Sequence, residues 1–323
     1  MKFSIVITTY NRLGLLKRAI ASALNQTVPC EVVVADDASC DGTEAYLRSL
    51  GDQVVYHRNT HNLNHAATVN AGVNAASGDW VKLLDDDDYL APDCIQAMVA
   101  ALSHYPQAVI GSCRAAQVDL SGNIIKYTPM VGPGQVSHIP QAAIHYGMLL
   151  DQVPFGTPVQ VAVRRDAFFK TGGWDTTMTT NYDDINAWVH LAEYGDALFI
   201  NDCLAYRTLW RGGNEQKMSI GQRLQLHITL KQGIYARVSD TYRAQCPSLE
   251  DLRAYLHLHW GLVALKQGHI KTAFDLVLPV VHRPAAWQLL GQARKLRFGC
   301  TPVEGLLTQV LPMQTLDVPP FDH

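Results

Sequence analysis

The chain has 323 residues, a length typical of about two domains, and its 48% hydrophobic and 17% charged residues exclude a disordered protein. A net charge of −3 gives no general reason to expect nucleic-acid binding. Seven cysteines without a CxxC pair favour a reduced, cytoplasmic protein over a disulfide scaffold, and no apolar run approaches the roughly 20 residues of a membrane-spanning helix.

The first hundred residues alternate between strand and helix patterns. Short β-branched runs predict buried strands at 3–8, 31–35, 53–57 and 79–84. Segments with helical spacing separate them, at 11–26, 41–50 and 65–77. This alternation predicts an α/β fold with a doubly wound, mostly parallel sheet.

The rest of the chain lacks this alternation of strands and helices. Gly and Pro interrupt residues 108–215, as in loops that shape a binding site. Residues 216–323 are mostly helical, include a helical hairpin broken at Gly268, and show no repeat of fixed period. This region holds 12 Lys and Arg against 7 Asp and Glu, a net +5, which leaves −8 for residues 1–215. An anionic partner or an ordinary basic, solvated helix face would explain the difference.

Polar segments follow three of the predicted strands, at 8–12, 36–43 and 85–89. The carboxyl ends of parallel strands meet at one edge of a sheet, where ligands bind, so these segments should lie together. If the chain stays extended through the four aspartates at 85–88, their side chains alternate between two faces. Mg²⁺ takes one or two carboxylates and completes its shell with substrate phosphates. We therefore predict a metal–diphosphate site here, with a solvated acidic turn as the alternative.

Six motifs together resemble the family 2 glycosyltransferases of the GT-A fold. In chain order they are SIVITTYNR, EVVVADDASCDGT, NAG, LLDDDDYLAPD, VAVRRDAFFKTGGWD and NYDDINAWVHLAEYG. They span about residues 2–215, so the resemblance does not cover the C-terminal region. It implies a nucleotide-sugar-binding half at 1–107, an acceptor-binding half at 108–215 and a helical C-terminal region at 216–323.

The resemblance also implies roles for residues of the first half. It places the pair Asp36 and Asp37 at the nucleotide, although for Asp36 a structural role in fixing the turn is the stronger interpretation. Asp85 would lie near the ribose or diphosphate and would bind Mn²⁺ or Mg²⁺ with Asp87, the better candidate for a direct ligand. Asp86 and Asp88 are possible substitutes for that pair. The expected nucleotide contacts are Thr8, Tyr10, Arg12, Asp37, Asp85 and Asp86.

In the second half, Asp184 matches the catalytic base, while Asp183 contacts substrate or simply begins a helix. Further diphosphate or acceptor contacts are expected from Trp174, Arg207 and Arg211, although the tryptophan could equally be core and either arginine a surface residue. The chain departs from the family where a basic residue often precedes the Asn-x-Gly helix, and where His190 replaces an arginine.

The expected function is therefore inverting, metal-dependent sugar transfer to a hydroxyl group of a glycan, a lipid-linked glycan or a protein. A UDP-sugar is the favoured donor, and the expected setting is bacterial glycan assembly in the cytoplasm or at the inner membrane face. The alternatives are a nucleotidyltransferase, whose Gly-rich basic loop is missing, and a non-catalytic nucleotide- or carbohydrate-binding protein. The basic, amphipathic segment 282–299 could contact anionic lipid, bind a partner protein or simply pack.

Overall fold

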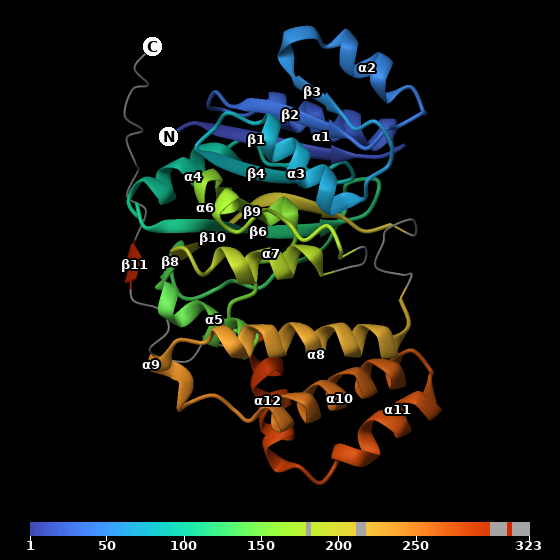
Figure 1. Cartoon of the computed structure of the whole chain (residues 1–323), viewed down its shortest axis with the longest axis vertical. Coiled ribbons are helices and arrows are strands. Elements are labelled where there is room, and N and C mark those ends of the chain that lie inside the picture. The colour runs from blue at the N-terminus through green and yellow to red at the C-terminus, as the bar shows by residue number, and fades with distance from the viewer. Residues whose placement is uncertain (179–181, 211–217, 298–308, 312–323) are drawn as a thin grey trace. The chain divides into compact units, whose positions relative to one another are not determined.

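A computed structural model of the chain describes residues 1–178, 182–210, 218–297 and 309–311. The chain forms two compact units (Figure 1). The sheet unit comprises Met1–Ile139, Phe155–Arg211 and Leu307–His323, and the helical unit comprises Pro140–Pro154 and Gly212–Leu306. Residues 140–154, which the sequence analysis places in the acceptor half, thus pack with the C-terminal helices, and the functional division into halves stays a prediction.

The sheet unit is built on one large sheet. Its strands are β1 (Phe3–Thr9), β2 (Glu31–Asp36), β3 (Val55–Arg58), β4 (Trp80–Asp85), β5 (Tyr89–Leu90), β6 (Ala108–Val118), β7 (Ile124–Tyr127), β8 (Val136–Ile139), β9 (Val161–Arg164), β10 (Asp196–Thr208) and β11 (Gln309–Leu311). Along the main path the order is β11-β8-β10-β6-β9-β4-β1-β2-β3, and only β9 and β8 of these described strands run against the others. The predicted mostly parallel sheet is confirmed.

Helices cover both faces of this sheet, as predicted for a doubly wound fold. They are α1 (Leu13–Leu24), α2 (Thr43–Ser49), α3 (His65–Ala75), α4 (Cys94–Ser103), α6 (Arg165–Lys170) and α7 (Asp183–Leu191). Ile5 and Ile7 of β1 pack with α1 and α4 in the main core, whereas Val6 points to the opposite face, against α3. Strands buried on both faces explain why the N-terminal strand runs are continuously apolar.

A buried lysine fixes the short 3₁₀ helix η2 (Pro158–Gln160) to the sheet. Lys82 is fully buried in β4, and its ammonium donates to the carbonyls of Leu83 at 3.0 Å, of Pro158 and Val161 at 3.4 Å each, and of Val159. Just before η2, the carbonyl of Gly156 accepts a hydrogen bond from the Trp188 indole at 3.1 Å. This path ties α7 to the centre of the sheet.

The helical unit consists of six described α-helices. They are α5 (Gln141–Leu149), α8 (Ile220–Arg237), α9 (Asp240–Arg243), α10 (Leu249–Lys266), α11 (Ile270–Val277) and α12 (Pro284–Arg297). An ion pair between buried Lys231 and half-buried Asp151 holds three of them together. The Lys231 ammonium donates to the carbonyls of Met148 and Leu149 and to Asp151 at 2.7 Å, and Asp151 also accepts from Tyr255 at 2.6 Å. Burial opposes ionisation, but the Lys231 charge lowers the pKa of Asp151 to about 2. The predicted C-terminal helices are confirmed.

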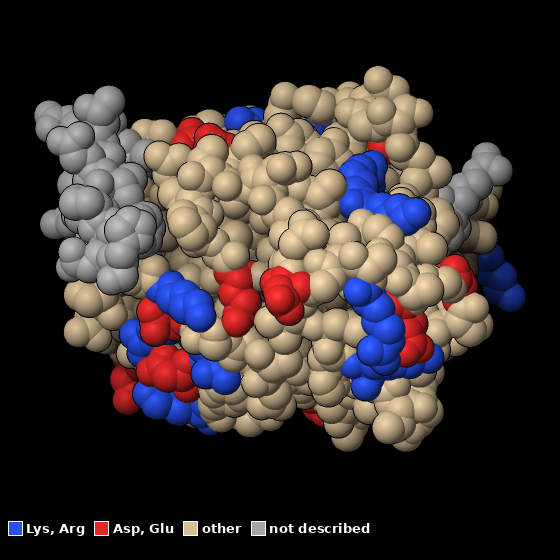
Figure 2. Space-filling model, turned by 90° about the horizontal axis from the view of Figure 1, so that it is seen from above, with Lys and Arg blue, Asp and Glu red and all other residues tan. Residues whose placement is uncertain are grey.

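The surface mixes charges of both signs. On the face seen in Figure 2, Lys and Arg side chains lie beside Asp and Glu side chains in small clusters, with uncharged residues between them. Among the described helices, none is both long and apolar enough to cross a bilayer.

Gly72 of the NAG motif should be required for the close packing of α3 on the sheet. A Cβ there would overlap Val6 and lie 3.2 Å from Ala35. Gly72→Ala should lower the free energy of unfolding by about 1–3 kcal/mol, measured by denaturant titration. Gly14→Ala, in α1 with nothing within 4 Å of its Cβ, is the matched control and should be neutral or slightly stabilising. Equal stabilities of the two variants would contradict this account.

Candidate active site

The predicted polar segments meet at one edge of the sheet. Parallel register places Thr8 of β1 opposite Asp85 of β4, and Thr9 opposite Asp36 of β2. The Thr8 hydroxyl donates to Asp85 at 3.2 Å, and the Thr9 hydroxyl donates to Asp86 at 2.8 Å. Tyr10, next in the chain, is 46% exposed, so its ring is open to a ligand at this edge.

The four aspartates divide into a buried and a more exposed pair. The side chains of Asp85 and Asp87 are 27% and 17% exposed, whereas Asp86 and Asp88 are buried. The extended backbone supposed from the sequence is wrong, because β4 ends at Asp85 and the chain turns, with the Asp88 N–H donating to the Asp85 carbonyl at 3.1 Å. The Thr208 N–H of β10 binds Asp88 at 2.7 Å. The turn therefore leaves Asp85 and Asp87 accessible, whereas Asp86 and Asp88 bind groups of β1 and β10 at the edge of the sheet.

Two arginines and a tryptophan of the described residues surround this turn. Arg12 donates to Asp86 at 3.0 Å and to Asp87 at 3.4 Å, and its guanidinium lies 5.2 Å from the Trp210 ring centroid. The Trp210 indole donates to Asp87 at 2.8 Å. Arg18 donates to the Asp87 carbonyl at 2.6 Å and to the Thr208 hydroxyl at 2.7 Å. The sequence analysis missed Arg18 and Trp210, which no motif marks.

The acidic turn is nevertheless short of positive charge. Burial raises the pKa of Asp86 to about 6 despite Arg12, and burial together with Asp85 raises the pKa of Asp87. Burial and the neighbouring Asp87 raise the pKa of Asp88 well above its usual value, against the weaker opposing charge of Arg207 on β10. A ligand that brings positive charge would relieve this repulsion.

Carboxylate oxygens are the donors that Mn²⁺ and Mg²⁺ prefer, so the residues at the turn fit such an ion. Among described residues, no three His, Cys, Asp or Glu side chains form a ready-made metal site. An ion held by Asp87 and Asp85 would therefore need phosphate or water oxygens to complete its shell, as is usual for Mg²⁺ bound with a nucleotide.

His65, the first residue of α3, joins the acidic turn to the second acidic motif. Its ring nitrogens lie 3.0 Å from Asp85 and 2.9 Å from Asp183. Burial alone would lower the pKa of His65, but the charges of both aspartates raise it well above the usual value, which makes both nitrogens donors. The sequence analysis noted a departure from the family before this helix, where a basic residue is often found, and did not recognise His65.

Asp183 and Asp184 begin α7, after Tyr182 in the left-handed region with φ 87°. The Asp184 N–H donates to the Asp183 carboxylate at 3.0 Å, and the Ile185 N–H donates to the Asp184 carboxylate at 2.7 Å. Burial and the adjacent Asp183 charge raise the pKa of Asp184 to about 7. A carboxylate with such a pKa takes up and releases protons near neutral pH, which suits a general base.

Other predicted residues already have protein partners. Asp36 accepts from the Tyr56 hydroxyl and Arg58, consistent with a turn-fixing role. Asp37 accepts from Asn59 at 2.8 Å and from two backbone N–H groups of the loop before α3. Trp174 packs against His65 and Trp188 and is only 2% exposed, so a sugar could stack on it only if neighbouring side chains moved. Arg211 lies outside the described residues.

The sequence of this chain is similar to those of known proteins. The family model described as Glycosyl transferase family 2 matches residues 4–171, just over half of the chain. The GalNAc(5)-diNAcBac-PP-undecaprenol beta-1,3-glucosyltransferase of Campylobacter jejuni is 32% identical over 130 residues, 39% of this chain and 41% of that protein. Protein CgeD of Bacillus subtilis is 28% identical over 228 residues, 64% of this chain and 50% of that protein. The matches thus span half or less of these two relatives.

Solved structures share the fold. S. aureus TarS 1-349 in complex with UDP-GlcNAc aligns with a TM-score of 0.61 at 16% identity, covering 92% of this chain and 82% of that one. Mannosyltransferase PcManGT from Pyrobaculum calidifontis, in complex with GDP-Man and Mn²⁺, aligns with a TM-score of 0.51 at 19% identity, covering 91% and 86%. The GT-A fold expected from the sequence is confirmed.

Removing the His65 bridge should destabilise the protein, because two carboxylates would lose a charged hydrogen-bond donor. His65→Ala should lower the free energy of unfolding by about 1–3 kcal/mol at pH 7, measured by denaturant titration without added metal. His61→Ala, an exposed histidine in the preceding loop, is the control and should change stability by less than about 0.5 kcal/mol. If both variants unfold at the same denaturant concentration, the bridge contributes nothing to stability.

Proposed function

Because the chain belongs to glycosyl transferase family 2, we propose that it transfers a sugar from a nucleotide diphosphate sugar to a hydroxyl group of an acceptor. The observation that carries the proposal is the meeting, at one sheet edge, of an acidic turn short of positive charge and a carboxylate whose pKa is about 7. The first can hold a metal–diphosphate pair, and the second can accept a proton from the attacking hydroxyl.

The donor would bind at the ends of β1, β2 and β4. Exposed Tyr10 would pack on the base, Arg12 would contact the diphosphate, and Thr8 and Asp85 would lie near the ribose. The carboxylate of Asp37 would bind the base only if it exchanged one of its present partners in the loop that precedes α3. UDP is our favoured carrier, since a structure with the same fold binds UDP-GlcNAc, although another binds GDP-Man.

A divalent ion, Mn²⁺ or Mg²⁺, would be held by Asp87 and Asp85 and would neutralise charge on the departing diphosphate. The Mn²⁺ complex of a protein with the same fold supports a metal in general. Without a ligand, the Arg12 guanidinium donates to Asp87 and Asp86. It would exchange these carboxylates for the phosphate oxygens when a diphosphate binds nearby.

Transfer would proceed with inversion, in one displacement. Asp184 would take the proton of the acceptor hydroxyl as that oxygen attacks the anomeric carbon, while the nucleotide diphosphate leaves from the opposite face. His65 would hold Asp183, and through it the start of α7, beside the donor. Asp183 is thus a positioning group here rather than a second base.

The acceptor is proposed only by class. One relative is named for transfer to a polyprenol-linked glycan and another, from Haloferax volcanii, is a glucosyl-dolichyl phosphate glucuronosyltransferase, 24% identical over 261 residues. We therefore favour a lipid-linked glycan in bacterial polysaccharide assembly, handled at the cytoplasmic side of the membrane. Family membership and the base-like pKa of Asp184 weigh against the nucleotidyltransferase and non-catalytic alternatives.

Asp184→Asn should reduce transfer by roughly 10²–10⁴-fold, because the amide cannot accept the hydroxyl proton. Nucleotide binding should be unchanged, and exposed Asp52→Asn should behave as wild type. For the wild type, kcat/KM should fall about tenfold per pH unit below pH 7 as Asp184 is protonated, and should level off above it. If Asp184→Asn turned over substrate at the wild-type rate, Asp184 could not be the general base.

Nucleotide binding should depend on metal and on Asp87. Calorimetric titration of UDP, GDP, CDP and dTDP, each with Mn²⁺, Mg²⁺ or EDTA, should find one nucleotide that binds only with metal. Asp87→Ala should lose this metal-dependent affinity, whereas the exposed Asp52→Ala should keep it. Equal affinity in EDTA, or unchanged affinity in Asp87→Ala, would contradict the metal assignment.

A further inference from the structure

The helical unit exposes a continuous line of large apolar side chains. Ile270, Phe274, Leu278, Val281 and Trp287, here called the apolar stripe, are 69%, 65%, 59%, 46% and 42% exposed. The first four follow each other at helical spacing along α11 and the 3₁₀ turn η4 (Leu278–Val280). Trp287 of α12 joins them, because its indole N–H donates to the Val281 carbonyl at 2.9 Å.

The stripe is not needed to fold the unit. The other side of α11 already packs on α10, where Ala273 is buried and Val277 lies against Gly261. Figure 1 shows α11 on the side of α10 away from α8, and the exposed fractions of its large apolar side chains place the stripe on the surface of the unit. Single exposed apolar residues are common, but a contiguous line of five is typical of an interaction surface.

The helices that carry the stripe are basic. Residues 249–297 contain seven Lys and Arg and three Asp and Glu, a net charge of +4 (7 − 3). Two of the acids, Glu250 and Asp251, already pair with Arg283. Within the described part of the chain, exposed Lys266, Lys271 and Arg294 take part in no ion pair.

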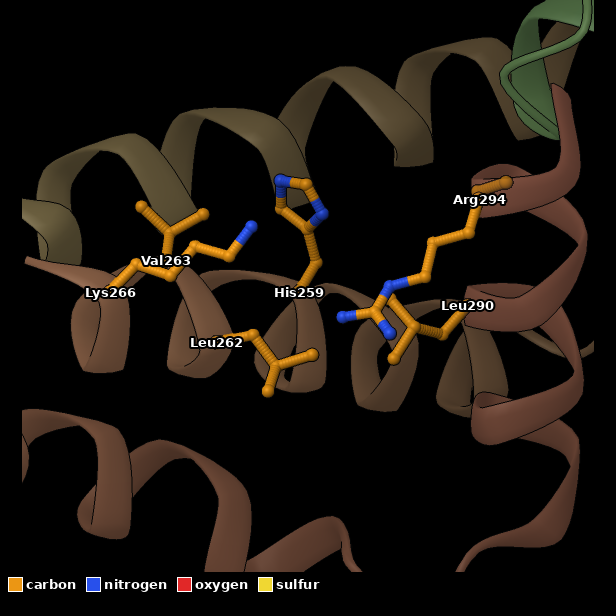
Figure 3. Close-up of a pocket in the computed structure, with 7 residues that line it drawn as sticks. His259, Leu262, Val263, Lys266, Leu290 and Arg294 are labelled. Carbon is orange, nitrogen blue, oxygen red and sulfur yellow. The ribbon is translucent and has the colours of Figure 1, made fainter. Parts of the chain in front are cut away.

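Part of this charge is gathered in one place. Lys266, Arg294 and His259 line a small pocket between α10 and α12, together with Leu262, Val263 and Leu290, as Figure 3 shows. Lys266 and His259 lie on the side of α10 that faces α8, so Lys271 of α11 is, among the described residues, the unpaired lysine next to the apolar stripe. Apolar and cationic side chains on one helix are the combination found on helices that lie in the interface of an anionic bilayer.

We propose that the apolar stripe docks the helical unit on an anionic lipid surface. Exposed Phe and Trp side chains would enter the headgroup–acyl boundary, and Lys271, next to Ile270 in α11, would contact lipid phosphates. A second copy of the chain is the less favoured occupant, because two surfaces of net positive charge repel each other. The proposal does not depend on the sugar-transfer chemistry.

This assignment differs from the segment that the sequence analysis considered. In residues 282–299, Leu290 is only 5% exposed and packs in the core of the helical unit with half-buried Leu289. Trp287 alone among the described apolar side chains of that segment faces outward enough to join a lipid contact. The surface for lipid is therefore formed mainly by α11, before that segment begins.

The test is flotation of the full chain with vesicles of phosphatidylcholine alone or with 30% phosphatidylglycerol. The wild type should float with the anionic vesicles, and raising the salt to 0.5 M should weaken binding. The double change Phe274→Glu and Leu278→Glu should weaken binding by about tenfold or more. The control, Ile124→Glu and Ile125→Glu, alters two similarly exposed residues of β7 in the sheet unit and should bind as wild type.

Thermal unfolding checks that each variant is folded, which is expected because all four side chains are exposed. Absence of wild-type flotation with anionic vesicles, or full flotation of the folded stripe variant, would overturn the proposal. So would sedimentation equilibrium showing a dimer that the stripe variant abolishes, since the stripe would then bind a second copy. Lys271→Gln should weaken binding to the anionic vesicles, and an unchanged affinity would contradict the role given to charge.

Discussion

The excess of negative charge at the carboxyl edge of the sheet is the constraint around which the site is organised. Parallel register of β1 with β4 places Thr8 and Asp85 side by side, and the turn after β4 adds three more carboxylates. Arg12, Arg18, His65 and the Trp210 indole each donate to this turn or to its backbone. Even so, burial keeps the pKa of Asp86 near 6, so the protein holds the site in a state that a cation would stabilise.

Much of the fold and the location of the site follow from the sequence, for a physical reason. Buried parallel strands have continuous apolar runs, and polar residues at their carboxyl ends must share an edge. The turn at Asp86–Asp87 was not foreseen, because an acidic run has no pattern that separates a strand from a turn. Arg18, Trp210 and the dual contact of His65 were missed because these contacts join residues that lie 20 to 123 positions apart in the chain.

The start of α7, with its two aspartates, is positioned from two directions. His65 of α3 holds Asp183 from the side of the acidic turn. From the core, Lys82 binds the carbonyls around η2, and the neighbouring Gly156 carbonyl binds Trp188, on the second turn of α7. A charged amine inside β4 would be costly without such partners, so the cage of carbonyls is what permits it. Buried polar contacts thus fix the position of the candidate base, Asp184, at the start of α7.

The chain crosses between the two units four times, after Ile139, Pro154, Arg211 and Leu306. Where a domain is appended to one end of another, the boundary is crossed once, and a single cut separates the two. Here a cut near residue 215 would remove Lys231 and leave the carbonyls of Met148 and Leu149 and the carboxylate of Asp151 without their donor. The helical unit is therefore built from two separate segments of the chain. Recombination could replace it only together with the segment that carries α5.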